Sequence, residues 1–96
     1  MSNSTRIKRF VVPASVRFVV NDDGAVLMDI NSGSIYSLNV VAGFIWNQLT
    51  AGRTREEIAD ALALKCHISK ELGLADVENF TIELVRNKLL KVDSTS

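Results

Sequence analysis

Cys66 and His67 are adjacent side chains that could act as a nucleophile and its base. A thiolate becomes a strong nucleophile when an imidazole lies within hydrogen-bonding distance and a third group orients that imidazole. Neighbouring residues on a helix point about 100° apart, so this pair does not meet in the required geometry. The sequence offers no clear third group. We therefore predict a structural role for Cys66 and no enzymatic activity.

Asp22, Asp23 and Asp29 are carboxylates that could hold a cation. A calcium loop needs oxygen ligands at regular spacing through about twelve residues, and these three lack that spacing. Asn and Asp before a glycine are typical of a tight turn, because their side chains bond the local backbone. We therefore predict a turn that ends at Gly24, with no metal site and no cofactor.

Tyr36 and Trp46 are aromatic residues that could stack on a base or another ligand. Aromatic residues beside apolar stripes are more often packed against the core, with one edge near water. The chain has eleven basic and eleven acidic residues, so its formal net charge is zero. A neutral chain lacks the electrostatic attraction that dominates binding to polyanions. We predict a packing role for both rings and no nucleic-acid partner.

Length and composition predict one folded domain. The chain has 96 residues, of which 47% are hydrophobic, and its single cysteine excludes an internal disulfide. No apolar run reaches the ~18–20 residues that cross a bilayer, so we predict a cytoplasmic protein with no membrane partner. The polar, basic start predicts a flexible N-terminal segment over residues 1–14. The folded domain is expected over 15–92, with a C-terminal tail over 93–96.

Three short segments alternate along the first half of the chain as strands do: residues 16–20, 25–30 and 35–38. Turn-forming residues at 21–24 and 31–33 separate them. Two tight turns in succession predict a three-stranded antiparallel sheet with the middle strand at its centre. The third strand is therefore expected to be an edge with unpaired backbone groups.

Two helices are predicted directly after this sheet. The first begins after Asn39 as its N-cap and ends before Gly52. Its expected buried stripe is Val41, Phe44, Ile45 and Leu49. The second begins at Thr54, because Thr54 and Glu57 have the spacing of a capping box.

A third helix is predicted from near Asp76 to Lys91, with a buried stripe of Val77, Phe80, Leu84 and Leu89. The path of residues 65–74 is not predicted. Sheet and helices are segregated along the chain, which predicts an α+β fold of winged-helix type. A winged-helix DNA-binding regulator is one function of such folds. However, the third helix has its acidic residues first and its basic residues last, the reverse of a DNA-reading helix.

The exposed third strand favours another function, the binding of a peptide by strand addition. The same edge could instead be blunted by its serines, or buried in a homodimer by a purely structural subunit. These alternatives remain open on the residues alone.

The combined pattern resembles the PqqD-like domains, which are small peptide-recognition elements of ribosomal peptide biosynthesis. The resemblance covers residues 15–92. The residues that carry it are Leu27 to Gly33, Tyr36, Ser37, Leu38, Asn39, Gly43, Ile45, Trp46, Leu49, Gly52 and Ile58. Within this family, a stand-alone chain of this length looks most like the leader-binding protein of lasso-peptide clusters.

This resemblance implies a non-catalytic adaptor that binds the leader of a precursor peptide and delivers it to a leader peptidase. The implied peptidase is a transglutaminase-like cysteine protease, and an ATP-dependent macrocyclase is a further possible partner. A peptide chaperone for a radical enzyme, as in quinone-cofactor biosynthesis, is the alternative within the family. We expect a monomer or a weak dimer.

The resemblance also implies where the leader lies, along the third strand and against the third helix. The strand residues are Ser34, Ile35, Tyr36, Ser37 and Leu38. The helix residues, chosen by helical spacing, are Phe80, Glu83, Leu84, Asn87 and Lys88. An apolar anchor of the leader is expected near Leu38, Phe80 and Leu84.

Overall fold

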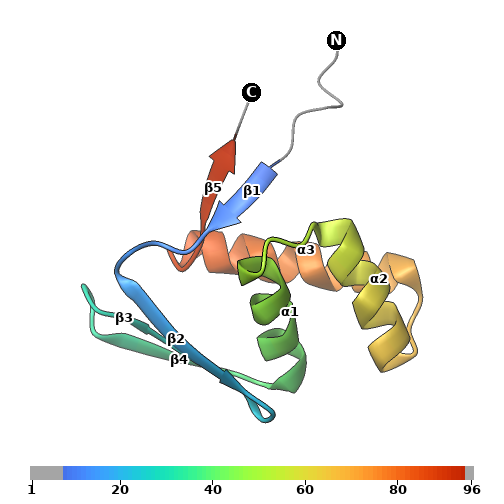
Figure 1. Ribbon diagram of the computed structural model, residues 1–96, viewed down its shortest axis with the longest axis horizontal. Coiled ribbons are helices and arrows are strands. Elements are labelled where there is room, and N and C mark those ends of the chain that lie inside the picture. The colour runs from blue at the N-terminus through green and yellow to red at the C-terminus, as the bar shows by residue number, and fades with distance from the viewer. Residues whose placement is uncertain (1–7, 95–96) are drawn as a thin grey trace.

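A computed structural model describes residues 8–94 of the chain (Figure 1). The elements follow in the order β1 (Lys8–Val11), β2 (Val16–Asn21), β3 (Gly24–Asp29), β4 (Ser34–Leu38), α1 (Val40–Thr50), α2 (Arg55–Cys66), α3 (Lys70–Arg86) and β5 (Lys91–Ser94). The predicted α+β class, with a three-stranded antiparallel sheet followed by three helices, is confirmed. All three helices lie on the same side of that sheet (Figure 1).

The sheet has the strand order β2-β3-β4, and both of its ladders are antiparallel. Phe18 lies opposite Leu27, and Leu27 lies opposite Tyr36. Residues directly opposite each other share one face of a sheet. Leu27 is fully buried, so this row defines the face that packs on the helices. The predicted turn before Gly24 is also present, where the Asp23 N–H donates to Asn21 Oδ1 at 2.8 Å.

Helix α1 begins as predicted at Asn39, whose side chain accepts a hydrogen bond from the Ala42 N–H at 2.8 Å. Its buried residues are Gly43, Ile45, Trp46 and Leu49. The predicted stripe was wrong at Val41, which is 38% exposed. The buried face of α1 consists of Gly43, Ile45, Trp46 and Leu49. The large ring of Trp46 therefore packs toward the sheet, and Val41 lies outside this face.

Gly43 and Gly24 lie where the backbone of α1 comes close to the backbone of the sheet. A Cβ atom on Gly43 would lie 2.8 Å from the Gly24 carbonyl carbon and 2.9 Å from its Cα. A Cβ on Gly24 would lie 1.9 Å from the Leu38 carbonyl oxygen, and Gly24 has a φ of +132°. A Cβ atom at either position would therefore force the neighbouring backbone to shift. The absence of these two Cβ atoms lets the backbone of α1 rest on the backbone of β3.

Helices α2 and α3 pack against each other and cross steeply (Figure 1). The predicted capping box is confirmed at the start of α2, where Thr54 Oγ1 accepts from the Glu57 N–H and Glu57 Oε1 accepts from the Thr54 N–H. Ion pairs link the two helices at Lys70–Asp60, 3.2 Å, and at Arg55–Glu78, 3.8 Å. These exposed pairs add little energy, so the buried side chains between the helices provide most of the stability.

The predicted bounds of the third helix were wrong at both ends. Helix α3 begins at Lys70, after the N-cap Ser69, whose Oγ accepts from the Leu72 N–H. It therefore includes much of the stretch 65–74 whose path was not predicted. The helix ends at Arg86, because Lys88 has a φ of +62° and its N–H bonds back to the Val85 carbonyl.

The buried residues after α3 belong to this helix end. The Leu89 N–H donates to the Leu84 carbonyl at 2.9 Å, which together with the Lys88 bond forms a Schellman motif. Leu89 and Leu90 are each 2% exposed. The apolar spacing that predicted a longer helix therefore comes partly from Leu89, which lies in the turn after α3. This turn, and not a further helical turn, returns the chain to the core.

Residues 1–14 were predicted to be flexible and residues 93–96 to be a tail. These predictions were wrong where β1 lies within the first segment and β5 overlaps the second. These two strands pair antiparallel, with Phe10 opposite Val92. Residues 1–7 and 95–96 lie outside the described residues. Each strand has four residues, and no short turn connects the two, because each strand's partner is at the other end of the chain. Such pairing leaves no local pattern in the sequence.

Replacing Gly43 with Ala should destabilise the fold. The added methyl group meets backbone atoms that no rotamer change can move, and such overpacking typically costs about 1–3 kcal/mol. The gain in helix propensity, about 1 kcal/mol, opposes this loss. We expect a net decrease of up to about 2 kcal/mol in the free energy of unfolding, measured by urea denaturation.

Asn47→Ala is the matched control, because Asn47 is exposed on the same helix. It should leave stability unchanged or raise it by about 0.5 kcal/mol. A Gly43→Ala protein more stable than the wild type by about 1 kcal/mol, the full gain in helix propensity, would contradict the proposed backbone contact.

Candidate functional site

Strand β4 is an open edge of the sheet. Its only partner strand among residues 8–94 is β3. Along an antiparallel edge strand, alternate residues direct their N–H and C=O groups away from the sheet. Ile35 is 62% exposed and Ser37 is also exposed, whereas Ser34, Tyr36 and Leu38 are half-buried. The strand therefore offers a row of backbone donors and acceptors without any charged side chain of its own.

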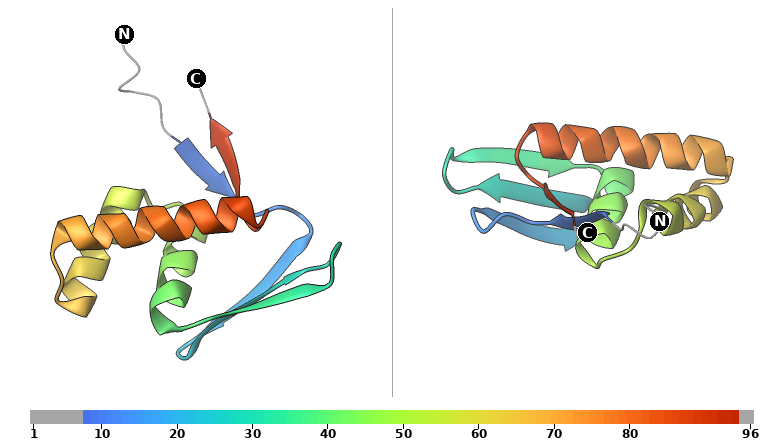
Figure 2. Two further views of the ribbon diagram at one scale, coloured as in Figure 1. Left: turned by 180° about the vertical axis from the view of Figure 1, so that it is seen from behind. Right: turned by 90° about the horizontal axis from the view of Figure 1, so that it is seen from above.

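Helix α3 lies along the β4 side of the sheet and not along the β2 side (Figure 2). The N-terminal end of α2 lies above α3 in Figure 1, and the sheet lies below it. Glu78 is turned toward that end of α2, because it pairs with Arg55. At 100° per residue, Phe80, Glu83 and Asn87 project from the opposite flank of the helix. We call these three residues the lower flank of α3; it points toward the sheet.

The lower flank combines an apolar surface with polar groups. Phe80 is half-buried and packs against the core, while Glu83 and Asn87 are exposed. The Asn87 side chain donates to the Glu83 carbonyl at 2.8 Å, and Glu83 forms an ion pair with Arg86 at 2.8 Å. Asp76 lies four residues before Phe80 and therefore projects from the same side of the helix as the lower flank. Sequence reasoning omitted Asp76 because the helix was expected only to begin there.

The structure brings most of the predicted site residues to this region. Tyr36, Leu38 and Phe80 all pack against the same core. Leu84 differs from its predicted role, because it is 3% exposed and belongs to the core itself. Lys88 also differs, because it follows the end of α3 in the left-handed conformation instead of lying on a helical face.

Such an arrangement can hold an extended peptide. A peptide strand added to β4 would complete the unpaired hydrogen-bonding groups of the edge, and the lower flank would contact its side chains. The half-buried rings of Tyr36 and Phe80 offer apolar contact next to that edge. Glu83 and Asn87 offer a carboxylate and an amide for polar contacts.

Among the described residues, the geometry does not support catalysis by Cys66 and His67, metal binding or a membrane-spanning helix. His67 ends α2 in the left-handed conformation, with a φ of +56°, directly after the half-buried Cys66. Among the side chains described, those of residues 10–92, no three from His, Cys, Asp or Glu gather closely enough to hold a metal ion. None of the helices described has the length and apolar character that spanning a membrane requires.

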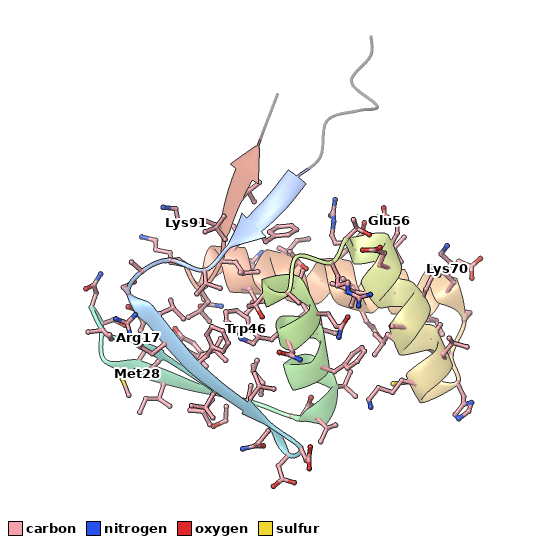
Figure 3. All side chains as sticks on the ribbon, viewed as in Figure 1. Arg17, Met28, Trp46, Glu56, Lys70 and Lys91 are labelled. Carbon is pink, nitrogen blue, oxygen red and sulfur yellow. The ribbon has the colours of Figure 1, made fainter. Side chains whose placement is uncertain are left out.

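Trp46 is a core residue and is not available to a ligand. Its side chain is fully buried between β2 and α1 (Figure 3), and its ring meets that of Phe18 edge to face, with centroids 5.2 Å apart. The indole N–H has no hydrogen-bond partner among the described residues, so packing alone holds the ring. The prediction of a packing role is confirmed for Trp46. Tyr36 packs against the core while remaining half-buried.

Comparison with known proteins agrees with this architecture. The model of the family described as coenzyme PQQ synthesis protein D (PqqD) matches residues 24–90. The chain belongs to the PqqD family. The matched region of this PqqD domain spans β3, β4 and all three helices, so it contains both parts of the candidate site. Among curated proteins, none matches the sequence.

Two solved structures are similar to this PqqD domain. One, described as TbiB1 in complex with the TbiA(beta) leader peptide, has 28% sequence identity and a TM-score of 0.77. It covers 83% of this chain and 93% of its own. The other, described as lasso peptide synthetase B1 complexed with the leader peptide, has 23% identity and a TM-score of 0.81. It covers 86% of this chain and 98% of its own, and at this identity it shows the shared fold.

Replacing Leu84 with Asp should unfold the PqqD domain. The change removes a buried side chain and places a carboxylate in the core, which together cost about 3–5 kcal/mol or more. Glu83→Ala changes the adjacent, exposed residue and should cost less than about 0.5 kcal/mol. Circular dichroism during thermal unfolding would measure both. A folded Leu84→Asp protein with normal stability would contradict the assignment of Leu84 to the core.

Proposed function

We propose that this protein is a non-catalytic adaptor that binds the leader of a ribosomally made precursor peptide by strand addition. The observation that carries the proposal is the open edge of β4 next to the lower flank of α3. Membership of the PqqD family and the likeness to two proteins solved with leader peptides support it. The leader lies beside β4, with its backbone paired to residues 34–38.

The energetics of such binding divide between the two sides of the site. Backbone hydrogen bonds to β4 are tolerant of sequence, because every residue except proline supplies the same groups. Ordering a disordered leader costs about 2–5 kcal/mol, so side-chain anchors must supply the additional binding free energy that offsets this cost. Phe80 and Tyr36 are the apolar contacts for one such anchor, with Leu38 beside them. Glu83 and Asn87 select among the polar residues of the leader.

We further propose that the bound leader is delivered to a leader peptidase, a transglutaminase-like cysteine protease, with an ATP-dependent macrocyclase acting afterwards. This order of events rests on the resemblance of the sequence to the leader-binding proteins of lasso-peptide clusters. The description of the family favours a second candidate, peptide chaperoning for a radical enzyme of quinone-cofactor synthesis. Both candidates use the same peptide site and differ in the enzyme that receives the peptide.

Replacing Phe80 with Ala should weaken leader binding at least about tenfold, because loss of one aromatic anchor costs 1.4 kcal/mol or more. The probe is a synthetic peptide with the sequence of the leader encoded beside this chain, and calorimetry measures its dissociation constant. Ile82→Ala is the matched control: Ile82 is an apolar residue of the same helix, 54% exposed and off the lower flank. It should leave the dissociation constant within about twofold of the wild type.

Hydrogen exchange provides an independent readout of strand addition. The leader should slow amide exchange within residues 34–38, while amides of β2, at the other edge of the sheet, should keep their rates. Normal leader affinity in a folded Phe80→Ala protein, or unchanged exchange in β4, would refute the proposed site.

Delivery can be tested by following cleavage of the precursor by the peptidase encoded nearby. Wild-type adaptor should raise the cleavage rate at precursor concentrations below the peptidase's own KM, because it raises the local concentration of bound leader. The Phe80→Ala protein should lose this stimulation, and Ile82→Ala should retain it. A cleavage rate that does not depend on the adaptor would reject delivery while leaving leader binding intact.

A further inference from the structure

The face of the sheet turned away from the helices is apolar at the open edge of β4. Ile35 lies opposite Met28, and Met28 lies opposite Arg17, so these three side chains form one row across that face, which we call the outer face. Ile35 is 62% exposed and Met28 is 42% exposed. All three helices lie on the other side of the sheet (Figure 1). The row therefore ends, at the edge of β4, in an exposed apolar side chain.

Ile35 also holds free backbone groups of this open edge. The N–H of Ile30, directly after β3, donates at 2.8 Å to the carbonyl of the residue before β2. Consecutive residues of an antiparallel strand direct their N–H and C=O groups to opposite sides, so, counted back from Ile30, the groups of Leu27 point to β4. The partner of Leu27 there is Tyr36, which therefore bonds to β3. Its neighbours Ile35 and Ser37 direct their backbone groups to the open edge.

We propose that Ile35 is a specificity-determining residue of the leader site, which selects an apolar side chain on the outer face. The inference rests on the proposed binding of a leader to β4. The leader residue held directly opposite Ile35 has its side chain on the same face, because pairing aligns the pleats of neighbouring strands. An apolar side chain there covers the exposed surface of Ile35, which favours binding. A charged side chain would lose contact with water without gaining a partner.

The bound leader is then read on both faces. Successive residues of a strand point to opposite faces, so the leader residue opposite Tyr36 points toward the helices. On that side, Tyr36 and Phe80 pack against the core and offer the contacts of the proposed inner anchor. The leader class that fits this chain therefore carries two adjacent apolar residues, one for each face. Ser37 is polar and exposed, so the leader residue opposite it is free to be polar.

Arg17, at the far end of the row, lies too far away to select an acidic residue of the leader. Neighbouring strands are about 4.8 Å apart, so a strand added to β4 lies three spacings, or about 14 Å, from β2. Exposed charges are largely screened beyond about 8 Å in physiological salt. The Arg17 guanidinium also donates to the Ala14 carbonyl, which holds it near its own strand. Contact with Ile35 therefore decides the choice of side chain on the outer face.

The first test compares two glutamate variants of the full chain, with calorimetry measuring the dissociation constant of a synthetic leader. Ile35→Glu should weaken binding about fivefold or more, because it replaces a favourable cross-strand contact with a charge. Val19→Glu is the matched control: Val19 is also β-branched and on the outer face, 66% exposed, but it lies on β2. It should leave the dissociation constant within about twofold of the wild type.

Thermal unfolding measures whether both glutamate variants fold. Ile35→Thr is a milder second variant, because it keeps the β-branched shape that strands favour while adding a polar group. It should weaken leader binding about threefold.

A second test identifies the leader residue opposite Ile35. In a set of synthetic leaders, each residue in turn is replaced by Lys. One of these peptides should bind Ile35→Glu about fivefold more tightly than it binds the wild type, because opposite charges pair across neighbouring strands. Its Lys should lie next to the position where Lys is most damaging to wild-type binding, which is the inner anchor. Val19→Glu should show no such preference for any peptide.

These outcomes separate the inference from the proposed function. If Phe80→Ala weakens leader binding but Ile35→Glu and Ile35→Thr do not, the role of Ile35 is overturned and leader binding stands. A scan in which no Lys peptide prefers Ile35→Glu would likewise overturn the contact on the outer face. A leader that does not bind the wild-type protein would overturn the proposed function, and this inference with it.

Discussion

The backbone contact between Gly43 and Gly24 is the constraint on which the rest of this structure depends. It joins the N-terminal part of α1 to the first residue of β3 with no side chain between them. Gly24 in turn lies against the carbonyl group of Leu38, at the end of β4. This contact therefore sets the distance between α1 and the sheet, and it lies where the start of β3 meets the end of β4. Larger residues at either position would separate the layers and open the core.

Close contact at one end of the sheet makes the core continuous from strands to helices. Trp46, one turn further along α1, fills the space over Leu27 and Phe18, and both Trp46 and Leu27 are fully buried. Leu84, Leu89 and Leu90 close the same core from α3 and the turn after it. Helix α3 is consequently held beside β4. The candidate site arises because an open strand edge and a fixed helix flank lie next to each other.

Local patterns predicted the parts of this fold that local interactions determine. The three strands of the sheet follow from two turns of a few residues each, and the capping box at Thr54 predicted the start of α2. The start of α3 was missed because Ser69 was not recognised as a cap before a polar first turn. Helical spacing assigned Leu84 both to the buried stripe and to the peptide site, and spacing alone does not decide between these two roles.

The sequence by itself determined the class of fold, the open edge of β4 and the absence of a recognisable catalytic constellation. These depend on alternation, turn residues and motif spacing, all of which act over a few residues. Only the tertiary structure decided which flank of α3 points toward the sheet, that Phe80 of the predicted buried stripe is only half-buried, and that β1 pairs with β5. It also showed that the second face of the sheet is left uncovered. Each of these depends on contacts between residues distant in sequence, whose geometry is set by packing and leaves no local pattern.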